Sequence, residues 1–104
     1  MKDLKFNLQF NYLYRDGGNY KRFGSIIFSN PTNLSVAELE DILRKRLIDE
    51  AYFYHEKLDV PPLFFNEIKA DDPSWHEYES MERTDQNNSD KRTIEEFLMI
   101  GIYL

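Results

Sequence analysis

Two short stretches of the chain hold residue types that could do chemistry. The first surrounds His76, which has carboxylates on both sides at Asp71, Asp72, Glu77 and Glu79. A histidine near several carboxylates can bind a divalent metal or carry out acid–base catalysis. The spacing is not diagnostic, because it lacks the His-Glu-x-x-His pattern by which a helix binds zinc.

The orientation of these side chains depends on whether the stretch is a strand. Side chains of a strand alternate between two faces, so Trp75, Glu77 and Glu79 would share one face, and His76 and Tyr78 the other. The simpler interpretation is a tryptophan anchored in the core beside an acidic outer edge, and we favour it over catalysis. The alternative is a small hydrolase or metal-dependent enzyme centred on His76 with nearby carboxylates.

The second stretch, residues 12–23, interleaves aromatic side chains with cations. Modules that bind single-stranded nucleic acid stack bases on aromatic rings and hold phosphates with cations. The simpler interpretation is that aromatic residues favour strands, while lysine and arginine solubilise an exposed face or edge. From the two stretches together, the candidate binding residues are Tyr14, Arg15, Tyr20, Lys21, Arg22, Trp75 and His76.

Composition limits the class of protein. The chain has 104 residues, 41% hydrophobic and 31% charged, which fits one domain over residues 1–104 with one core. Its net charge of -6 argues against general nucleic-acid binding, which depends on neutralising phosphates. The charge is uneven, with five cations and two aspartates in residues 1–34 and two cations and eight acids in residues 60–90. No apolar run approaches the ~20 residues of a membrane-spanning helix, so we expect no membrane association.

The sequence contains no cysteine and two histidines. Disulfides, thiolate zinc sites and cysteine nucleophiles are therefore excluded, and two imidazoles are too few for a histidine-rich metal site. We expect no metal and no cofactor. The absence of cysteine fits the reducing cytoplasm.

The N-terminal part predicts a long antiparallel hairpin. Hydrophobic and polar residues alternate over 5–15, the turn formers Asp-Gly-Gly-Asn follow, and a second strand covers 20–29. A three-residue loop would pair Phe10 with Ile26, whereas a two- or four-residue loop would pair Leu8 with Ile27. We favour the first register, because Ile26 and Phe28 make the stronger apolar face.

A helix is predicted over 35–49. Ser35 and Glu38 form a capping box, and an apolar stripe runs through Leu39, Leu43 and Leu47. Acidic residues come early in this helix and basic residues late, as the helix dipole favours.

The remaining elements are less sharply defined. Residues 51–58 fit either a helical extension or a strand. Short strands are predicted over 63–68 and 75–83, and a second capping box at Thr93 and Glu96 opens a C-terminal helix. Residues 97–104 are apolar on every side, so a closing strand is the alternative. The order β-β-α-(β)-β-β-α predicts an α+β fold, with a mainly antiparallel sheet and one or two helices packed on one face.

Three segments resemble a family of small bacterial proteins of about this length. They are Tyr14–Lys21, Phe28–Pro31 and Asp72–Glu79, which include the patterns Tyr-Arg-Asp-x-x-Asn-Tyr-Lys and Asp-x-x-Trp-His-Glu. No activity, cofactor or partner comes with this resemblance, and it assigns no functional residue. It implies a complete bacterial cytoplasmic protein.

The function favoured by these patterns is non-enzymatic. Sixteen aromatic residues are many for one small core, so some should remain exposed, where tyrosine and tryptophan favour protein interfaces. We therefore expect a small interaction or accessory domain that binds another protein or a second copy of itself. The metal-dependent or hydrolytic enzyme and the single-stranded nucleic-acid binder are the two alternatives.

Overall fold

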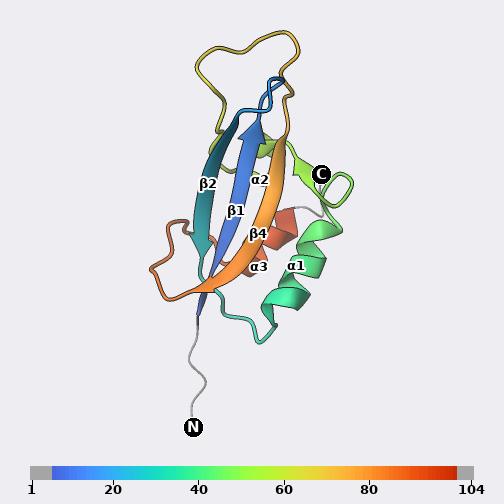
Figure 1. Cartoon of the computed structure of the whole chain (residues 1–104). Helices are drawn as coiled ribbons and strands as arrows, with labels where there is room; N and C mark the ends of the chain where they lie inside the picture. The colour runs from blue at the N-terminus through green and yellow to red at the C-terminus, as the bar shows by residue number, and fades with distance from the viewer. Residues whose placement is uncertain (1–5, 101–104) are drawn as a thin grey trace.

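The computed structural model describes residues 6–100, which form an α+β fold around one antiparallel sheet (Figure 1). Its four strands lie in the order β2-β1-β4-β3. The elements are β1 (Asn7–Arg15), β2 (Lys21–Phe28), α1 (Val36–Arg44), β3 (Tyr52–Phe53), α2 (His55–Leu58), β4 (His76–Thr84) and α3 (Ile94–Ile100). The predicted α+β class with an antiparallel sheet is confirmed. None of the helices in this range is long and apolar enough to cross a membrane.

The predicted hairpin register is also confirmed. Leu8 pairs with Phe28 and Phe10 with Ile26, which leaves residues 17–19 as a three-residue loop. The left-handed position of this loop belongs to Asn19, with a φ of 68°, rather than to a glycine. The carboxylate of Asp16 accepts hydrogen bonds from two backbone amides of the turn and fixes its shape.

Strand β4 lies where a strand was predicted, and it contains a bulge that explains its poor alternation. Asn11 of β1 pairs with Ser80, but the next residue of β1, Tyr12, pairs with Tyr78. Glu79 is therefore an extra residue on β4, and the pattern of buried side chains shifts by one position there.

Helix α1 has the predicted start but an earlier end. Ser35 and Glu38 form the reciprocal capping box, yet the helix ends at Arg44, five residues before the predicted boundary. Tight turns follow, in which Asp49 and Glu50 both have positive φ values that a helix does not allow. Leu47 is buried although it lies outside the helix.

The C-terminal helix is confirmed as far as it is described. Thr93 and Glu96 exchange the two hydrogen bonds of a capping box, and α3 continues to Ile100. The alternative of a strand from residue 97 is wrong over 97–100, and residues 101–104 lie outside the described range.

Two predictions for the middle of the chain need correction. Residues 51–58 are neither one strand nor one helix, because they contain the short strand β3 and then the single turn α2. Residues 63–68, predicted as a strand, are irregular. They belong to a long loop from residue 59 to residue 75, which arches over one end of the sheet (Figure 1, yellow-green to yellow).

One buried cluster joins the strands and the helices, and aromatic rings form its centre. Phe10 lies within 6 Å of the rings of Tyr12, Phe53, Tyr78 and Phe97 by centroid distance. Leu39 and Leu43 of α1 and Leu58 of α2 belong to the same cluster. The Tyr78 hydroxyl donates a 2.6 Å hydrogen bond to Glu40 and so ties α1 to β4.

Candidate functional site

The long loop over residues 59–75 is held to the core face of the sheet by side chains of β1 and β4. The hydroxyl of Tyr12 donates a 2.7 Å hydrogen bond to the carbonyl of Pro61, and that of Tyr14 donates one of the same length to Pro73. Both tyrosines are buried. Tyr14 is thus a structural anchor in this structure, and its ring is not on the surface.

His76 is buried beneath the same loop, with 0% of its surface exposed. Its Nε2 accepts a 2.9 Å hydrogen bond from the backbone amide of Leu63, and its Nδ1 is buried with no partner among the described residues. Burial, reinforced by the neighbouring His55, lowers the pKa of His76 to about 4. The imidazole is therefore neutral at pH 7.

The carboxylates near His76 in sequence do not surround it. Glu77 faces the opposite side of the sheet, and the rings of Tyr14, Phe53 and Phe64 pack around the imidazole instead, within 6 Å by centroid distance. In residues 6–100, no three histidine, aspartate or glutamate side chains are placed to hold a metal ion.

Trp75 is the residue whose position differs most from the sequence interpretation. It was expected to anchor the core, but 42% of its surface is exposed and it lies just before the first residue of β4. The side chain that takes the buried place at this end of the strand is His76. The residue types and not the alternation misled the prediction, since His76 and Tyr78 do share the buried face.

The cations and aromatics of the hairpin are spread over several environments. Arg15 makes a two-point ion pair with Glu77, with N–O distances of 2.8 and 3.2 Å, and this bonding raises the pKa of Arg15. Arg22 donates to the carbonyl of Phe64 and lies over the ring of Phe65. Tyr20 and Lys21 are exposed. The structure therefore does not gather the hairpin residues into one stacking platform.

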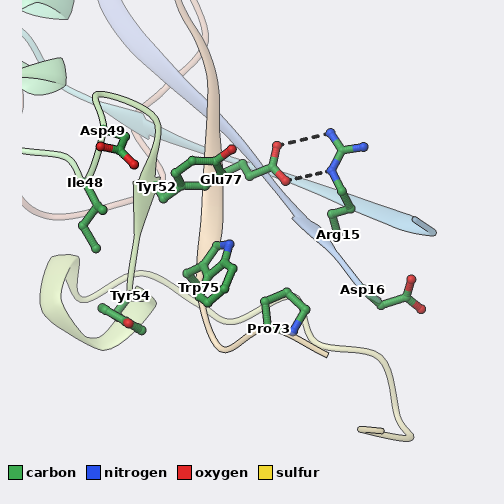
Figure 2. Close-up of a pocket in the computed structure, with 9 residues that line it drawn as sticks. All are labelled: Arg15, Asp16, Ile48, Asp49, Tyr52, Tyr54, Pro73, Trp75 and Glu77. Atoms are coloured by element: carbon green, nitrogen blue, oxygen red, sulfur yellow. Dashed lines mark hydrogen bonds and ion pairs between the residues drawn. The ribbon is translucent and has the colours of Figure 1, made fainter. Parts of the chain in front are cut away.

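A surface pocket of about 620 Å³ brings together parts of both candidate stretches (Figure 2). We call it the aromatic groove. Its lining residues are Arg15, Asp16, Ile48, Asp49, Tyr52, Tyr54, Pro73, Trp75 and Glu77. It contains one candidate binding residue from each predicted stretch, Arg15 and Trp75, and several residues that sequence reasoning missed.

The groove is formed by the sheet, by residues 48–54 and by the end of the long loop over residues 59–75. Tyr52 of β3 pairs with Glu77 of β4, so their side chains lie side by side. The ring of Trp75 meets that of Tyr52 edge-on, with centroids 6.5 Å apart. Pro73 is positioned by its bond to the buried Tyr14. In Figure 2, Trp75 lies between Tyr54 on one side and Pro73 on the other.

The charges around the groove are predominantly negative. It holds three carboxylates, Asp16, Asp49 and Glu77, and one cation, Arg15, which is paired with Glu77. The balance is therefore -2, from one positive and three negative side chains. Asp49 has a φ of 52°, a left-handed conformation that aspartate tolerates better than most residues and that often occurs at functional positions.

A sequence signal for the missed residues did exist. Tyr52 and Tyr54 are two positions apart, which places them on one face if the segment is a strand, although its sequence also fits a helix.

Comparison of the chain with protein-family models, curated proteins and solved structures finds no significant match.

Proposed function

We propose that this chain is a small, non-enzymatic interaction domain, and that its aromatic groove binds an extended, basic segment of a partner protein. The single observation that carries the proposal is the partly exposed Trp75, which lines the groove together with Tyr52, Tyr54 and three carboxylates. Tryptophan and tyrosine in such positions supply most of the binding energy at protein interfaces.

The charge of the groove favours a cationic occupant. The carboxylate of Asp49 makes no ion pair with any described residue, and the same holds for Asp16. A lysine or arginine side chain would meet these carboxylates and could lie against the face of an aromatic ring. Such cation–π contacts contribute roughly 0.5–2 kcal/mol, depending on how far the cation is desolvated.

The shape of the groove favours a segment of protein chain. Its volume of about 620 Å³ holds several side chains, and Ile48, Tyr54 and Trp75 each keep part of their apolar surface exposed around it. Aromatic grooves of this kind suit extended peptides, whose ordering cost is low when proline stiffens the chain.

Trp75 is the only tryptophan of the chain, so its fluorescence reports on the groove directly. The probe is a nine-residue peptide of alternating proline and lysine, with a peptide of alternating proline and glutamate as its charge-reversed control. We expect saturable fluorescence changes with the basic peptide and none with the acidic one. Binding should weaken as salt is added, because partly exposed charges are screened.

Substitutions locate the binding. Tyr54→Ala should weaken it by roughly tenfold, the loss expected for an interface aromatic. Asp49→Asn should weaken it by several-fold through charge alone, since asparagine also tolerates the left-handed backbone. The matched controls are Tyr20→Ala and Asp85→Asn, which alter an exposed aromatic and an exposed carboxylate outside the groove. Equal effects of groove and control variants would contradict the proposal, as would the absence of any binding below about 1 mM.

A further inference from the structure

A second surface lies on the opposite edge of the sheet. Among residues 6–100, β2 is a terminal strand of the sheet with β1 as its one neighbouring strand, and part of its outer edge is already covered. The amide of Ile27 donates to the hydroxyl of Ser89, and the carbonyl of Ile27 accepts from the amides of Ser89 and Asp90. The loop after β4 therefore caps the edge at Ile27.

The direction of the Ile27 backbone groups also shows which other residues of β2 direct their backbone amide and carbonyl away from β1. In a strand, the amide and carbonyl of one residue point to the same side, and successive residues alternate. Since Ile27 points away from β1, so do Ser25, Phe23 and Lys21. The carbonyl of Tyr20, an even-numbered position, points inward and accepts from Asp16, in agreement with this parity.

These outward groups have no partner in the described part of the chain. No hydrogen bond joins the backbone of Lys21, Phe23 or Ser25 to any segment beyond the hairpin within residues 6–100. The side chains around them are unusual for an exposed edge, because Phe23 is 58% exposed and Tyr20 is 71% exposed. Unpaired edges of this kind template the addition of another strand.

The charge of the edge selects the kind of strand. Lys21 and Arg22 are exposed, and within residues 6–100 neither has a carboxylate in ion-pair distance. The hydrogen bond from Arg22 to Phe64 leaves the charge of Arg22 in place, because a carbonyl is neutral. A cationic edge on a chain of net charge -6 favours an acidic strand.

We propose that an acidic, extended segment of a partner protein adds to the sheet along Lys21–Ser25 as a further antiparallel or parallel strand. Main-chain hydrogen bonds to Lys21, Phe23 and Ser25 hold it, and its carboxylates meet Lys21 and Arg22. A second copy of the chain fits less well, because two identical edges bring like charges together. This inference does not depend on the aromatic groove.

The test adds a seven-residue peptide of alternating glutamate and valine to the full chain. Binding is monitored through the backbone amide chemical shifts of the chain. We expect shifts concentrated at residues 20–26, with affinity falling as salt is added. Two control peptides should each bind at least roughly tenfold more weakly. One is the same peptide N-methylated on alternate residues, which cannot pair through its backbone, and the other is a peptide of alternating lysine and valine.

Two variants separate the backbone from the charge. Ser25→Pro removes one outward amide and spares the bonds to β1, and it should weaken binding roughly tenfold, whereas Ser25→Ala keeps the amide and should not. Lys21→Glu should weaken binding, and Lys57→Glu, the same charge change on α2, should have a smaller effect. Shifts confined to the groove, or N-methylation without effect, would overturn the proposal. So would a dimer that Ser25→Pro dissociates, which would assign the edge to a second copy.

Discussion

Acidification provides the sharpest test of the buried histidine. His76 has a pKa of about 4 in the folded chain against an ordinary value of 6.5, chiefly because burial penalises its charged form. Between these two values the unfolded chain binds a proton that the folded chain does not. Stability must therefore rise with pH across this window and fall as the solution is acidified.

The magnitude follows from the two pKa values. At pH 7 the histidine is mostly neutral in both states, so its contribution to the pH dependence is small. At pH 5 it is mostly protonated in the unfolded chain and still neutral in the folded one, which costs about 2 kcal/mol of unfolding free energy. The titratable side chains that face the imidazole are Tyr12, Tyr14 and His55, and the charge of Glu56 partly opposes the lowering of the His76 pKa.

The assay is chemical denaturation at pH 7 and pH 5, with His76→Gln as the reference. Glutamine does not titrate, and its carbonyl can accept the amide of Leu63 as Nε2 does. The acid-induced loss should be about 2 kcal/mol larger in the natural chain than in the variant. The carboxylates whose pKa values are lowered by hydrogen bonds, Glu38, Asp72 and Asp90, are present in both proteins, so their contribution to the acid-induced loss cancels in this comparison. Equal losses in the two proteins would refute a buried neutral His76.

Three further outcomes are expected. Replacing Leu43, which is 1% exposed in the core, with alanine should cost about 2–5 kcal/mol in chemical denaturation, and a loss below ~0.5 kcal/mol would mean that α1 buries a different face. Protein purified without chelator should contain no stoichiometric transition metal by elemental analysis, and its melting curve should not change in EDTA; bound metal would instead favour an enzyme. Labelled single-stranded DNA and RNA should bind no tighter than about 10⁻⁵ M at physiological salt, because Arg15, Lys21 and Arg22 supply at most three phosphate contacts; sub-micromolar binding abolished by Arg22→Ala would make the hairpin the functional site.

Local signals were enough to predict the elements whose determinants are near in sequence. The alternation of residues 5–15, with Leu13 as its exception, predicts the face of β1 that meets the core, and two capping boxes mark the starts of α1 and α3 through contacts three residues apart. The hairpin register followed from matching the apolar faces of its two strands. The capping boxes depend on residues three positions apart, and the hairpin register depends on two strands that a short turn joins directly.

The elements that were missed depend on distant partners. Residues 63–68 have the composition of a strand, but the amide of Leu63 donates to the ring of His76 and the carbonyl of Phe64 accepts from Arg22, so these two backbone groups are bonded without a sheet. The bulge at Glu79 reverses the alternation in β4 and hides its buried face from a period-two pattern. No local signal in the sequence could show either contact.

The core and the aromatic groove are linked through the long loop. Tyr14 lies on the buried face of β1, yet its hydroxyl donates to the carbonyl of Pro73, which lines the groove. His76 is buried and accepts a hydrogen bond from the amide of Leu63, whereas the preceding residue, Trp75, is exposed in the groove. The two candidate stretches are therefore connected by structure and not by shared chemistry. The hairpin stretch contributes the buried anchors Tyr12 and Tyr14, and the other stretch contributes the buried His76 and the exposed Trp75. The aromatic residues beside the long loop therefore have two roles. Tyr12 and Tyr14 hold the long loop by hydrogen bonds, and Tyr52, Tyr54 and Trp75 form the surface that we propose binds a partner.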